Sequence, residues 1–159
     1  MHANADLIES LYGALGRRDG ATMVACYAPD ARFADPVFDL TGGEVGAMWT
    51  MLCARAHDIV VEWRDVRADD ALGSGNWDAR YTFAATGRRV HNRIHSEFTF
   101  ERGRIATQRD TFDMRAWLRM AIGPVTLLPG MRGLVERRVR SQARRGLDEW
   151  IERHRGSSP

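Results

Sequence analysis

The 159-residue sequence predicts one α+β domain in which three helices precede a long antiparallel sheet. Two patterns indicate this class. Up to about residue 56, apolar residues recur every three or four positions, and from residue 59 to about 113 they alternate with polar ones. Helical spacing then returns. We therefore expect a domain over residues 4–116 and an arginine-rich, amphipathic helical tail over residues 117–159.

The helices before the sheet are defined by their apolar spacing and their capping residues. The first is expected over residues 4–18 with Asn4 as its N-cap, the second over residues 21–28 and the third over residues 44–56. A short strand, ARFAD, lies between the second and third helices and ends at Pro36.

Four strands are expected after residue 58. In the first three, apolar residues occupy every second position, starting at Ile59, Trp77 and Ile94. The fourth strand is expected over residues 104–113. The segment Gly73-Ser74-Gly75 is interpreted as a turn because glycine often interrupts strands.

The charge is distributed unevenly along the chain. All 23 basic residues are arginine, and no lysine occurs, which indicates that genome base composition as well as function selected arginine. Residues 1–116 hold 14 arginines against 17 acidic residues, a net charge of −3, whereas residues 117–159 hold 9 against 4, a net of +5. Such a tail could attract phosphates or an anionic membrane surface, but we do not expect nucleic-acid binding.

The tail contains a long amphipathic helix from about residue 131 to residue 153. Its apolar residues follow at four- and three-residue spacing: Val135, Val139, Ala143, Leu147 and Trp150. Three interpretations remain open. The helix packs on its own domain or on a partner subunit, it forms a lid over a ligand cavity, or it lies on a membrane surface.

Several protein classes are excluded by composition. The longest weakly charged stretch, residues 117–131, contains Arg119 and two prolines, so no membrane span is expected. The N-terminus lacks the pattern of a signal peptide, and Cys26 and Cys53 have neither metal nor disulfide-framework spacing. We therefore expect a cytoplasmic protein without a metal or another cofactor. Glycine-rich phosphate loops and a nucleophile elbow are also missing from the sequence.

Two segments carry a resemblance to a known family. The order of elements, with YAPDARFADP before the third helix and GRIATQRDTFD in the last strand, resembles the nuclear transport factor 2-like superfamily. Its SnoaL-like branch includes ketosteroid isomerases, limonene epoxide hydrolases and polyketide cyclases. The resemblance covers about residues 4–116. It implies a cone-shaped, curved antiparallel sheet whose N-terminal helices enclose a pocket for an apolar small molecule, in a homodimer.

Asp35 falls where ketosteroid isomerases have their general base. Such a base needs a carboxylate in an apolar pocket over an acidic C–H group. The tyrosine and protonated aspartate that hold the enolate oxygen in that family fall here at Leu11 and Ser96. Tyr12 is one helical step of about 100° away and is expected to point elsewhere. The alternative is that Asp35 only accepts backbone hydrogen bonds in a turn.

Asp110 matches one of the paired catalytic aspartates of limonene epoxide hydrolases, and polyketide cyclases have their acid/base aspartate on the same strand. In the hydrolases an arginine joins the two aspartates. Here the neighbouring strand reads Asp78-Ala79-Arg80, which reverses the order of those charges. Arg80 or Arg93 could hold one carboxylate ionised. The alternative is a structural ion pair between Asp110 and an arginine of the next strand.

The candidate catalytic residues are therefore Asp35, Asp110, Arg80 and His95. His95 shares a strand face with His91, so it is a base if that face lines the cavity and an interface group if it does not. Substrate-binding candidates are mainly aromatic: Tyr27, Phe33, Trp49, Trp63, Tyr81, Ser96, Phe98 and Phe112.

Together, these residues predict a cofactor-free acid/base enzyme, an isomerase, cyclase or hydrolase, that acts on an apolar organic molecule. The alternative is a non-catalytic ligand-binding or assembly module of the same fold, because this fold supports many unrelated functions.

Overall fold

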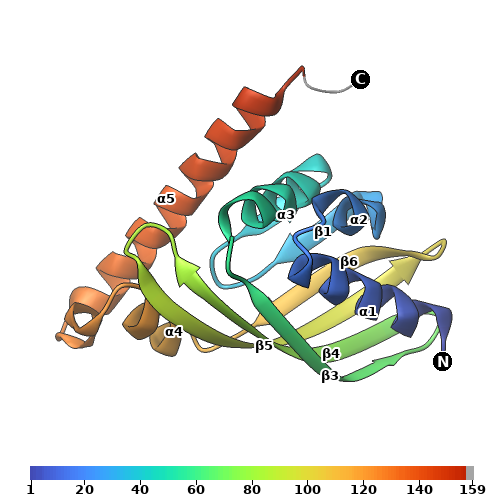
Figure 1. Cartoon of the computed structure of the whole chain (residues 1–159), viewed down its shortest axis with the longest axis horizontal. Helices are drawn as coiled ribbons and strands as arrows, with labels where there is room; N and C mark the ends of the chain where they lie inside the picture. The colour runs from blue at the N-terminus through green and yellow to red at the C-terminus, as the bar shows by residue number, and fades with distance from the viewer. Residues whose placement is uncertain (157–159) are drawn as a thin grey trace.

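A curved, six-stranded sheet forms the centre of the computed structural model, which describes residues 1–156 (Figure 1). Its strands are β1 (Tyr27–Ala34), β2 (Asp39–Thr41), β3 (Val60–Ala68), β4 (Leu72–Phe83), β5 (Arg88–Glu101) and β6 (Arg104–Thr111). They lie in the order β2-β1-β6-β5-β4-β3. Neighbours are antiparallel except β1 and β6, which are parallel. The α+β class and the curved sheet predicted from the sequence are confirmed.

Helices cover one face of the sheet and one of its ends (Figure 1). They are α1 (Ala3–Gly16), α2 (Gly20–Ala25), α3 (Gly43–Arg55), α4 (Met114–Ala121), the 3₁₀-helix η1 (Pro124–Leu127) and α5 (Met131–His154). Helix α1 packs on β3 and β4, α3 packs on β1, and α4 packs on β5. The core therefore lies between the first three helices and the inner face of the sheet.

Strand β5 shows how the sequence assigns side chains to the two faces. Ile94, Ser96 and Phe98 are buried, while the residues between them are exposed. This period of two matches the alternation in the sequence, because successive side chains of a strand point to opposite faces. The inner face of β5 thus delivers one small polar residue, Ser96, into an otherwise apolar layer.

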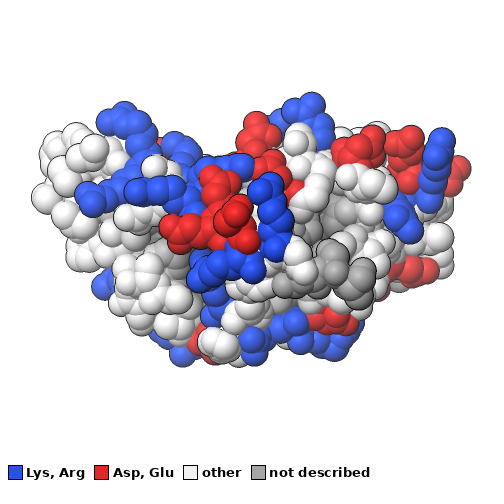
Figure 2. Space-filling model, turned by 90° about the horizontal axis from the view of Figure 1, so that it is seen from above, with Lys and Arg blue, Asp and Glu red and all other residues white. Residues whose placement is uncertain are grey.

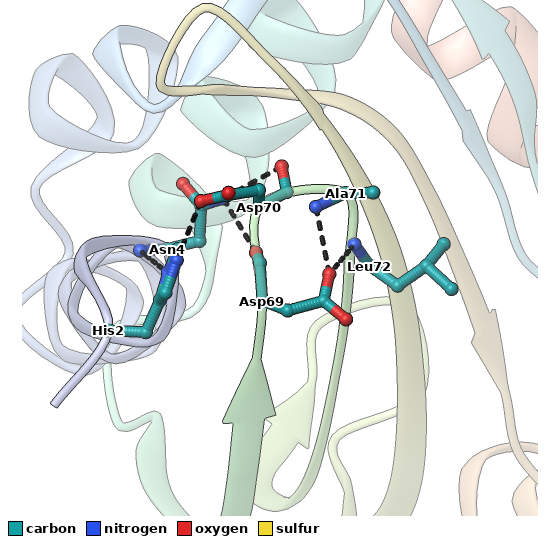
Figure 3. Close-up of polar contacts among 6 residues, drawn as sticks. All are labelled: His2, Asn4, Asp69, Asp70, Ala71 and Leu72. Carbon is teal, nitrogen blue, oxygen red and sulfur yellow. Dashed lines mark hydrogen bonds and ion pairs between the residues drawn. The ribbon is translucent and has the colours of Figure 1, made fainter.

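The N-terminus of α1 is attached to the turn between β3 and β4 (Figure 3). The expectation that Asn4 caps this helix is wrong: the ring of His2 is the cap and accepts from the Asn4 backbone N–H. The Asn4 side chain instead donates to the carbonyl oxygens of Asp69, at 2.9 Å, and Asp70, at 3.3 Å. These hydrogen bonds satisfy two backbone acceptors of the turn and fix α1 against the sheet.

Gly73 and Gly75 lie inside β4 rather than in a turn, which corrects the interpretation of that segment. The turn comes earlier, where Asp69 Oδ1 accepts from the N–H groups of Ala71 and Leu72. A Cβ on Gly73 would stand 2.9 Å from the side chain of Ile8, and one on Gly75 would stand 2.9 Å from the Tyr12 hydroxyl. The glycines therefore allow α1 to approach the sheet closely.

Helix α5 packs against its own domain at two places. Val135 and Val139 contact the cluster under α4, and Leu147 is fully buried. Arg144 forms an ion pair with Glu44 of α3. The first of the three interpretations, packing of the tail helix on its own domain, therefore holds for one face of α5. None of the helices within residues 1–156 combines the length and apolarity needed to cross a membrane.

Candidate functional site

Asp110 belongs to a buried row of paired residues that crosses three strands of the sheet. Ser96 of β5 is paired with Asp110 of β6 on one side and with Gly75 of β4 on the other. On the far side of β6, Ala34 is paired with Arg109, so Asp35 follows beside Asp110. Paired residues of adjacent strands share a face, so Ser96 and Asp110 both belong to the buried inner face, and Asp35, the first residue after β1, is partly buried next to this row.

The Asp110 carboxyl group is held by one of its two oxygens. Oδ1 accepts hydrogen bonds from Ser96 Oγ, at 2.6 Å, and from Gln108 Nε2, at 2.9 Å. Oδ2 receives no hydrogen bond from any group in residues 1–156. Since a neutral carboxyl group carries its proton on the less engaged oxygen, protonated Asp110 presents an O–H donor at Oδ2.

The hydrogen bonds around Asp110 extend across the whole interior. On one side, Trp77 Nε1 donates to Ser96 Oγ at 2.9 Å. On the other, Gln108 Oε1 accepts from the Tyr27 hydroxyl at 2.5 Å, and that hydroxyl accepts from Trp49 Nε1 at 2.8 Å. We call these six residues the interior network: Trp49, Tyr27, Gln108, Asp110, Ser96 and Trp77. Five hydrogen bonds join the six side chains, which fixes the orientation of Gln108 and of the carboxyl group.

Tyr12 adds a second unused donor to this site. Its side chain is 1% exposed, with its ring 5.4 Å from that of Trp77, and the hydroxyl has no hydrogen-bond partner within residues 1–156. Burial raises the pKa of this hydroxyl well above its usual value; neighbouring Ser96 lowers it and the charge of Asp110 raises it. Tyr12 was expected to point elsewhere than the family's tyrosine, but its hydroxyl lies near Ser96 and Asp110.

Asp35 combines a turn with an unusual environment. Its Oδ1 accepts from the backbone N–H groups of Val37, at 2.7 Å, and Phe38, at 2.6 Å, as the turn interpretation expects. Burial nevertheless raises the pKa of Asp35 to about 6, although both N–H groups act to lower it. The structural and the functional interpretations of this residue are thus compatible.

The two carboxyl groups influence each other. Burial raises the pKa of Asp110 to about 7; the hydrogen bonds from Ser96 and Gln108 oppose this rise, and the negative charge of Asp35 adds to it. Of the two groups, Asp110 therefore holds its proton to the higher pH. No arginine pairs with Asp110 among the described residues, so the alternative of a structural ion pair is wrong.

Arg80 and His95 do not reach this site. Arg80 is exposed on the outer face of the sheet, 3.3 Å from the Glu62 carboxylate. His95 is also exposed there and is hydrogen-bonded to Asn76 at 2.7 Å. Each stands one position from an inward-facing residue, so the period of two turns it outward. Arg93 is exposed for the same reason. Neither Arg80 nor Arg93 therefore lies where it could hold the carboxylate of Asp35 or Asp110 ionised.

Most of the aromatic candidates belong to the hydrophobic core or pack against it. Tyr27, Phe33, Trp49 and Phe98 are buried, and Tyr81 and Phe112 are partly buried. Trp63 is 38% exposed and contacts Tyr12 from the edge of the sheet. Two hollows, of about 660 and 350 Å³, share Thr107 and Arg109 on the outer face of β6, and neither includes Asp35 or Asp110.

Sequence reasoning missed three residues of the site, and each left a signal. Tyr12 follows Ile8 by four positions, which places both on the buried stripe of α1. Gln108 precedes Asp110 by two positions on one strand, so the two share a face. Trp77 was expected to face inward, but its role as a hydrogen-bond donor was missed. That role depends on the register between β4 and β5, which brings its indole N–H beside Ser96. Within residues 1–156, no group of three or more His, Cys, Asp or Glu residues is arranged to hold a metal ion.

Comparison with solved structures finds proteins of the same fold. An epoxide hydrolase of the limonene epoxide hydrolase type from M. tuberculosis is 22% identical, with a TM-score of 0.65, and the match covers 79% of this chain and 94% of the other. IdmH of Streptomyces antibioticus, a candidate polyketide cyclase, is 21% identical, with a TM-score of 0.63 and coverage of 75% and 98%.

A third solved structure is a nuclear transport factor 2-like protein of unknown function from Burkholderia pseudomallei. It is 22% identical, with a TM-score of 0.64, and the match covers 76% of this chain and 98% of the other. At these identities the likenesses show the fold alone. No protein of curated function matches the sequence. The family described as the SnoaL-like domain matches residues 8–108, well over half of the chain, and the protein therefore belongs to the SnoaL-like family.

Proposed function

We propose that this SnoaL-like protein is an acid/base enzyme, an isomerase, cyclase or hydrolase, that acts on an apolar organic molecule without a cofactor. One observation carries the proposal: two neighbouring interior carboxyl groups have pKa values raised to about 6 and about 7. Perturbed values of this kind occur where an enzyme needs a base and an acid at neutral pH.

The two carboxyl groups take different roles. Asp35, ionised above pH 6, has Oδ1 engaged by backbone N–H groups and uses Oδ2 as the base. It removes a proton from an acidic C–H group or from an attacking water molecule. Asp110, protonated at Oδ2, donates that proton to the substrate oxygen that becomes negative. In an isomerisation, Asp35 returns its proton to a different carbon and Asp110 recovers its own, so that both groups are regenerated.

The Tyr12 hydroxyl supplies a second donor to the same substrate oxygen. It has no acceptor within residues 1–156 and lies close to Ser96 and Asp110. Two preorganised donors in a low-dielectric interior stabilise an oxyanion far better than they would in water. Tyr12 and Asp110 thus supply the charge stabilisation that neither Leu11 nor Ser96 could provide at the positions first considered.

The substrate class follows from the walls of the site. Apart from the interior network, the buried side chains that surround the carboxyl groups are aliphatic or aromatic, among them Phe33 and Phe98. A flat, apolar molecule with one carbonyl or epoxide oxygen matches such walls and the two donors. Epoxide hydrolysis and polyketide cyclisation, named for two proteins of the same fold, are reactions of this kind.

The experiment compares Asp35→Asn and Asp110→Asn with the wild type on a panel of enones and epoxides. Each variant should lower kcat/KM by about 10²- to 10⁴-fold, the usual contribution of a general acid or base. Asp30→Asn, at an exposed position of β1, is the matched control and should leave turnover unchanged. Undiminished turnover in both interior variants would refute the proposal.

A second candidate function is a non-catalytic ligand-binding module. The observation in its favour is that aromatic side chains fill the interior and that both hollows lie on the outer face of the sheet. Measurement of ligand binding by calorimetry on the same panel separates the two functions. Binding that tolerates Asp35→Asn and occurs without turnover favours this second function.

Assembly and location are inferred as well. We infer a homodimer through the outer face of the sheet, where exposed charges of both signs, such as Arg109 and Glu97, can pair between copies. Sedimentation at micromolar concentration tests this dimer, and a monomer would contradict it.

A cytoplasmic location agrees with Cys26 and Cys53, which are both free and buried. Fractionation of cells checks this location.

A further inference from the structure

The end of the molecule formed by α4, η1 and the first turns of α5 exposes apolar side chains. Four of them are between 45% and 55% exposed, and we call them the apolar tip: Val125, Leu127, Leu128 and Leu134. Residues 123–130 (GPVTLLPG) contain no charged group. In Figure 2 this end, at the left as in Figure 1, is a broad uncharged surface bordered by basic residues. Exposed apolar groups gathered in this way mark a contact surface.

Arginines surround the apolar tip. Residues 114–147 contain eight arginines and a single acidic residue, Glu136. Three of these arginines are held in ion pairs with Glu136, Glu44 or Asp148. The other five are exposed and form no ion pair within residues 1–156: Arg115, Arg119, Arg137, Arg138 and Arg145. Their charge is therefore available to an external partner.

The outward face of α5 joins the two features. Leu134, Arg137, Arg138 and Arg145 are three, four and eleven positions apart, so they share one helix face, and all four are exposed. The opposite face carries Leu147, which packs against the core. Leu134 therefore lies on the same face as three unpaired arginines, and residues 1–156 leave this face exposed.

We propose that this end of the molecule binds the surface of a bilayer that contains anionic lipids. The leucines of the tip enter the boundary between headgroups and acyl chains, and the five unpaired arginines contact lipid phosphates. Residues 1–116 have a net charge of −3, so the field of the protein turns its basic end toward an anionic surface.

Charge also argues against other occupants of this surface. A second copy bound across a two-fold axis would bring the same unpaired arginines face to face, which is unfavourable. Nucleic acid would satisfy the arginines, but the uncharged segment 123–130 offers it neither a donor-rich side chain nor an aromatic ring for stacking. An anionic bilayer alone satisfies both the leucines and the arginines.

Co-sedimentation with vesicles tests this proposal on the full chain. The protein should bind vesicles that contain about 30% phosphatidylglycerol in phosphatidylcholine, and not vesicles of phosphatidylcholine alone, and salt should weaken the binding. Arg137→Gln with Arg138→Gln should lower the partition coefficient by about 25-fold, at about fivefold for each charge. Leu127→Ser with Leu128→Ser should lower it by at least about tenfold.

The matched control is Arg102→Gln with Arg104→Gln, which removes two exposed arginines at the β5–β6 turn, far from α4, and should change nothing. Equal binding to neutral and anionic vesicles, no binding to either, or equal losses in the two arginine pairs would each overturn the proposal. So would a wild-type dimer that the leucine variant converts to a folded monomer, because the tip would then be a protein interface.

Discussion

The interior network and the apolar tip depart from ordinary burial in opposite directions. The network places a carboxyl group, 4% exposed, among aromatic rings, whereas the tip leaves four aliphatic side chains about half exposed. Five hydrogen bonds join the network, while Asp110 Oδ2 and the hydroxyl of neighbouring Tyr12 remain unengaged within residues 1–156. Around the tip, the unengaged groups are the five arginines that form no ion pair within residues 1–156. In both regions, polar or charged side-chain groups have no hydrogen-bond or ion-pair partner within residues 1–156.

This difference indicates how each region should respond to substitution. Changes in the network alter buried hydrogen bonds and packing, so they should move the free energy of unfolding by kilocalories per mole. Changes at the tip alter groups that are already solvated, so they should leave stability almost constant. The following predictions run from the largest expected effect on stability to the smallest.

Asp110→Asn should change the pH dependence of stability most strongly. The pKa of Asp110 in the folded protein, about 7, exceeds the ordinary value near 4, so the folded state binds the extra proton and stability falls as the pH rises from about 4 to about 7. The variant lacks this penalty. It should be more stable than the wild type by on the order of 4 kcal/mol at about pH 8, and similar near pH 4, by urea denaturation.

Asp78→Asn is the control of opposite sign. Hydrogen bonds from Arg64 and His91 lower the pKa of Asp78, so this group favours the folded state above its unfolded pKa, and that stability is lost as the pH falls. Its removal should therefore destabilise the protein at neutral pH. Denaturation curves of Asp110→Asn that run parallel to those of the wild type at every pH would show that Asp110 is not the buried acid described above.

Gly75→Ala should destabilise the protein by about 2 kcal/mol, because the new Cβ would stand 2.9 Å from the Tyr12 hydroxyl and 3.3 Å from Val66. The Tyr12 ring is confined by Trp77 and Phe98 and cannot move away without a shift of α1. Thermal unfolding measures the loss. Gly43→Ala, where a Cβ would meet nothing within 4 Å, should leave the melting temperature nearly unchanged.

Tyr12→Phe should raise stability by about 1 kcal/mol, since it removes a buried hydroxyl that has no partner in residues 1–156. Turnover should fall at the same time, because the variant loses one of the two donors to the substrate oxygen. Unfolding and kinetics on one preparation provide both readouts. A large loss of stability would mean that the hydroxyl has a structural role.

Leu128→Ser, in the apolar tip, should change the free energy of unfolding by less than about 0.5 kcal/mol, because its side chain is already 55% exposed. Chemical denaturation measures this. A loss comparable to that of Gly75→Ala would show that the tip belongs to the core and would remove the contrast between the two regions.

The activity predicted for the site has a narrow pH range. Asp35 must be ionised, above about pH 6, and Asp110 must be protonated, below about pH 7. The profile of kcat/KM should therefore be a bell whose two limbs belong to the coupled pair. Stopped assays across the range check it, and a single sigmoidal limb would mean that only one carboxyl group takes part.

The elements could be predicted from the sequence because their periods are local. The helices over residues 3–16 and 43–55 and the alternation in β5 follow from spacing alone. The prediction of Asn4 as the N-cap was wrong because its side chain donates to a backbone carbonyl of a distant turn instead of capping its own helix. The prediction of a turn at Gly73 and Gly75 was wrong because these glycines allow α1 to approach the sheet, and no local sequence pattern reveals that contact.

The candidate site could be predicted only in part, since it depends on register between distant strands. Asp35 and Asp110 were found through a family resemblance. Arg80 and His95 were chosen by charge and chemistry, although each is one position from an inward-facing residue and therefore faces outward. Tyr12 was set aside because the family's tyrosine falls one residue earlier, yet helical spacing from Ile8 places it inside.

The parallel pairing of β1 with β6 has a consequence for folding. The meander from β3 to β6 consists of neighbouring strands joined by short turns, which can form from local contacts. Strand β1 can join only by closing a long loop onto β6, and this costs more chain entropy. We therefore expect the two acidic groups to meet late in folding, after the meander has formed. A folding intermediate that contains only the meander would escape their mutual repulsion, and it would carry no working site.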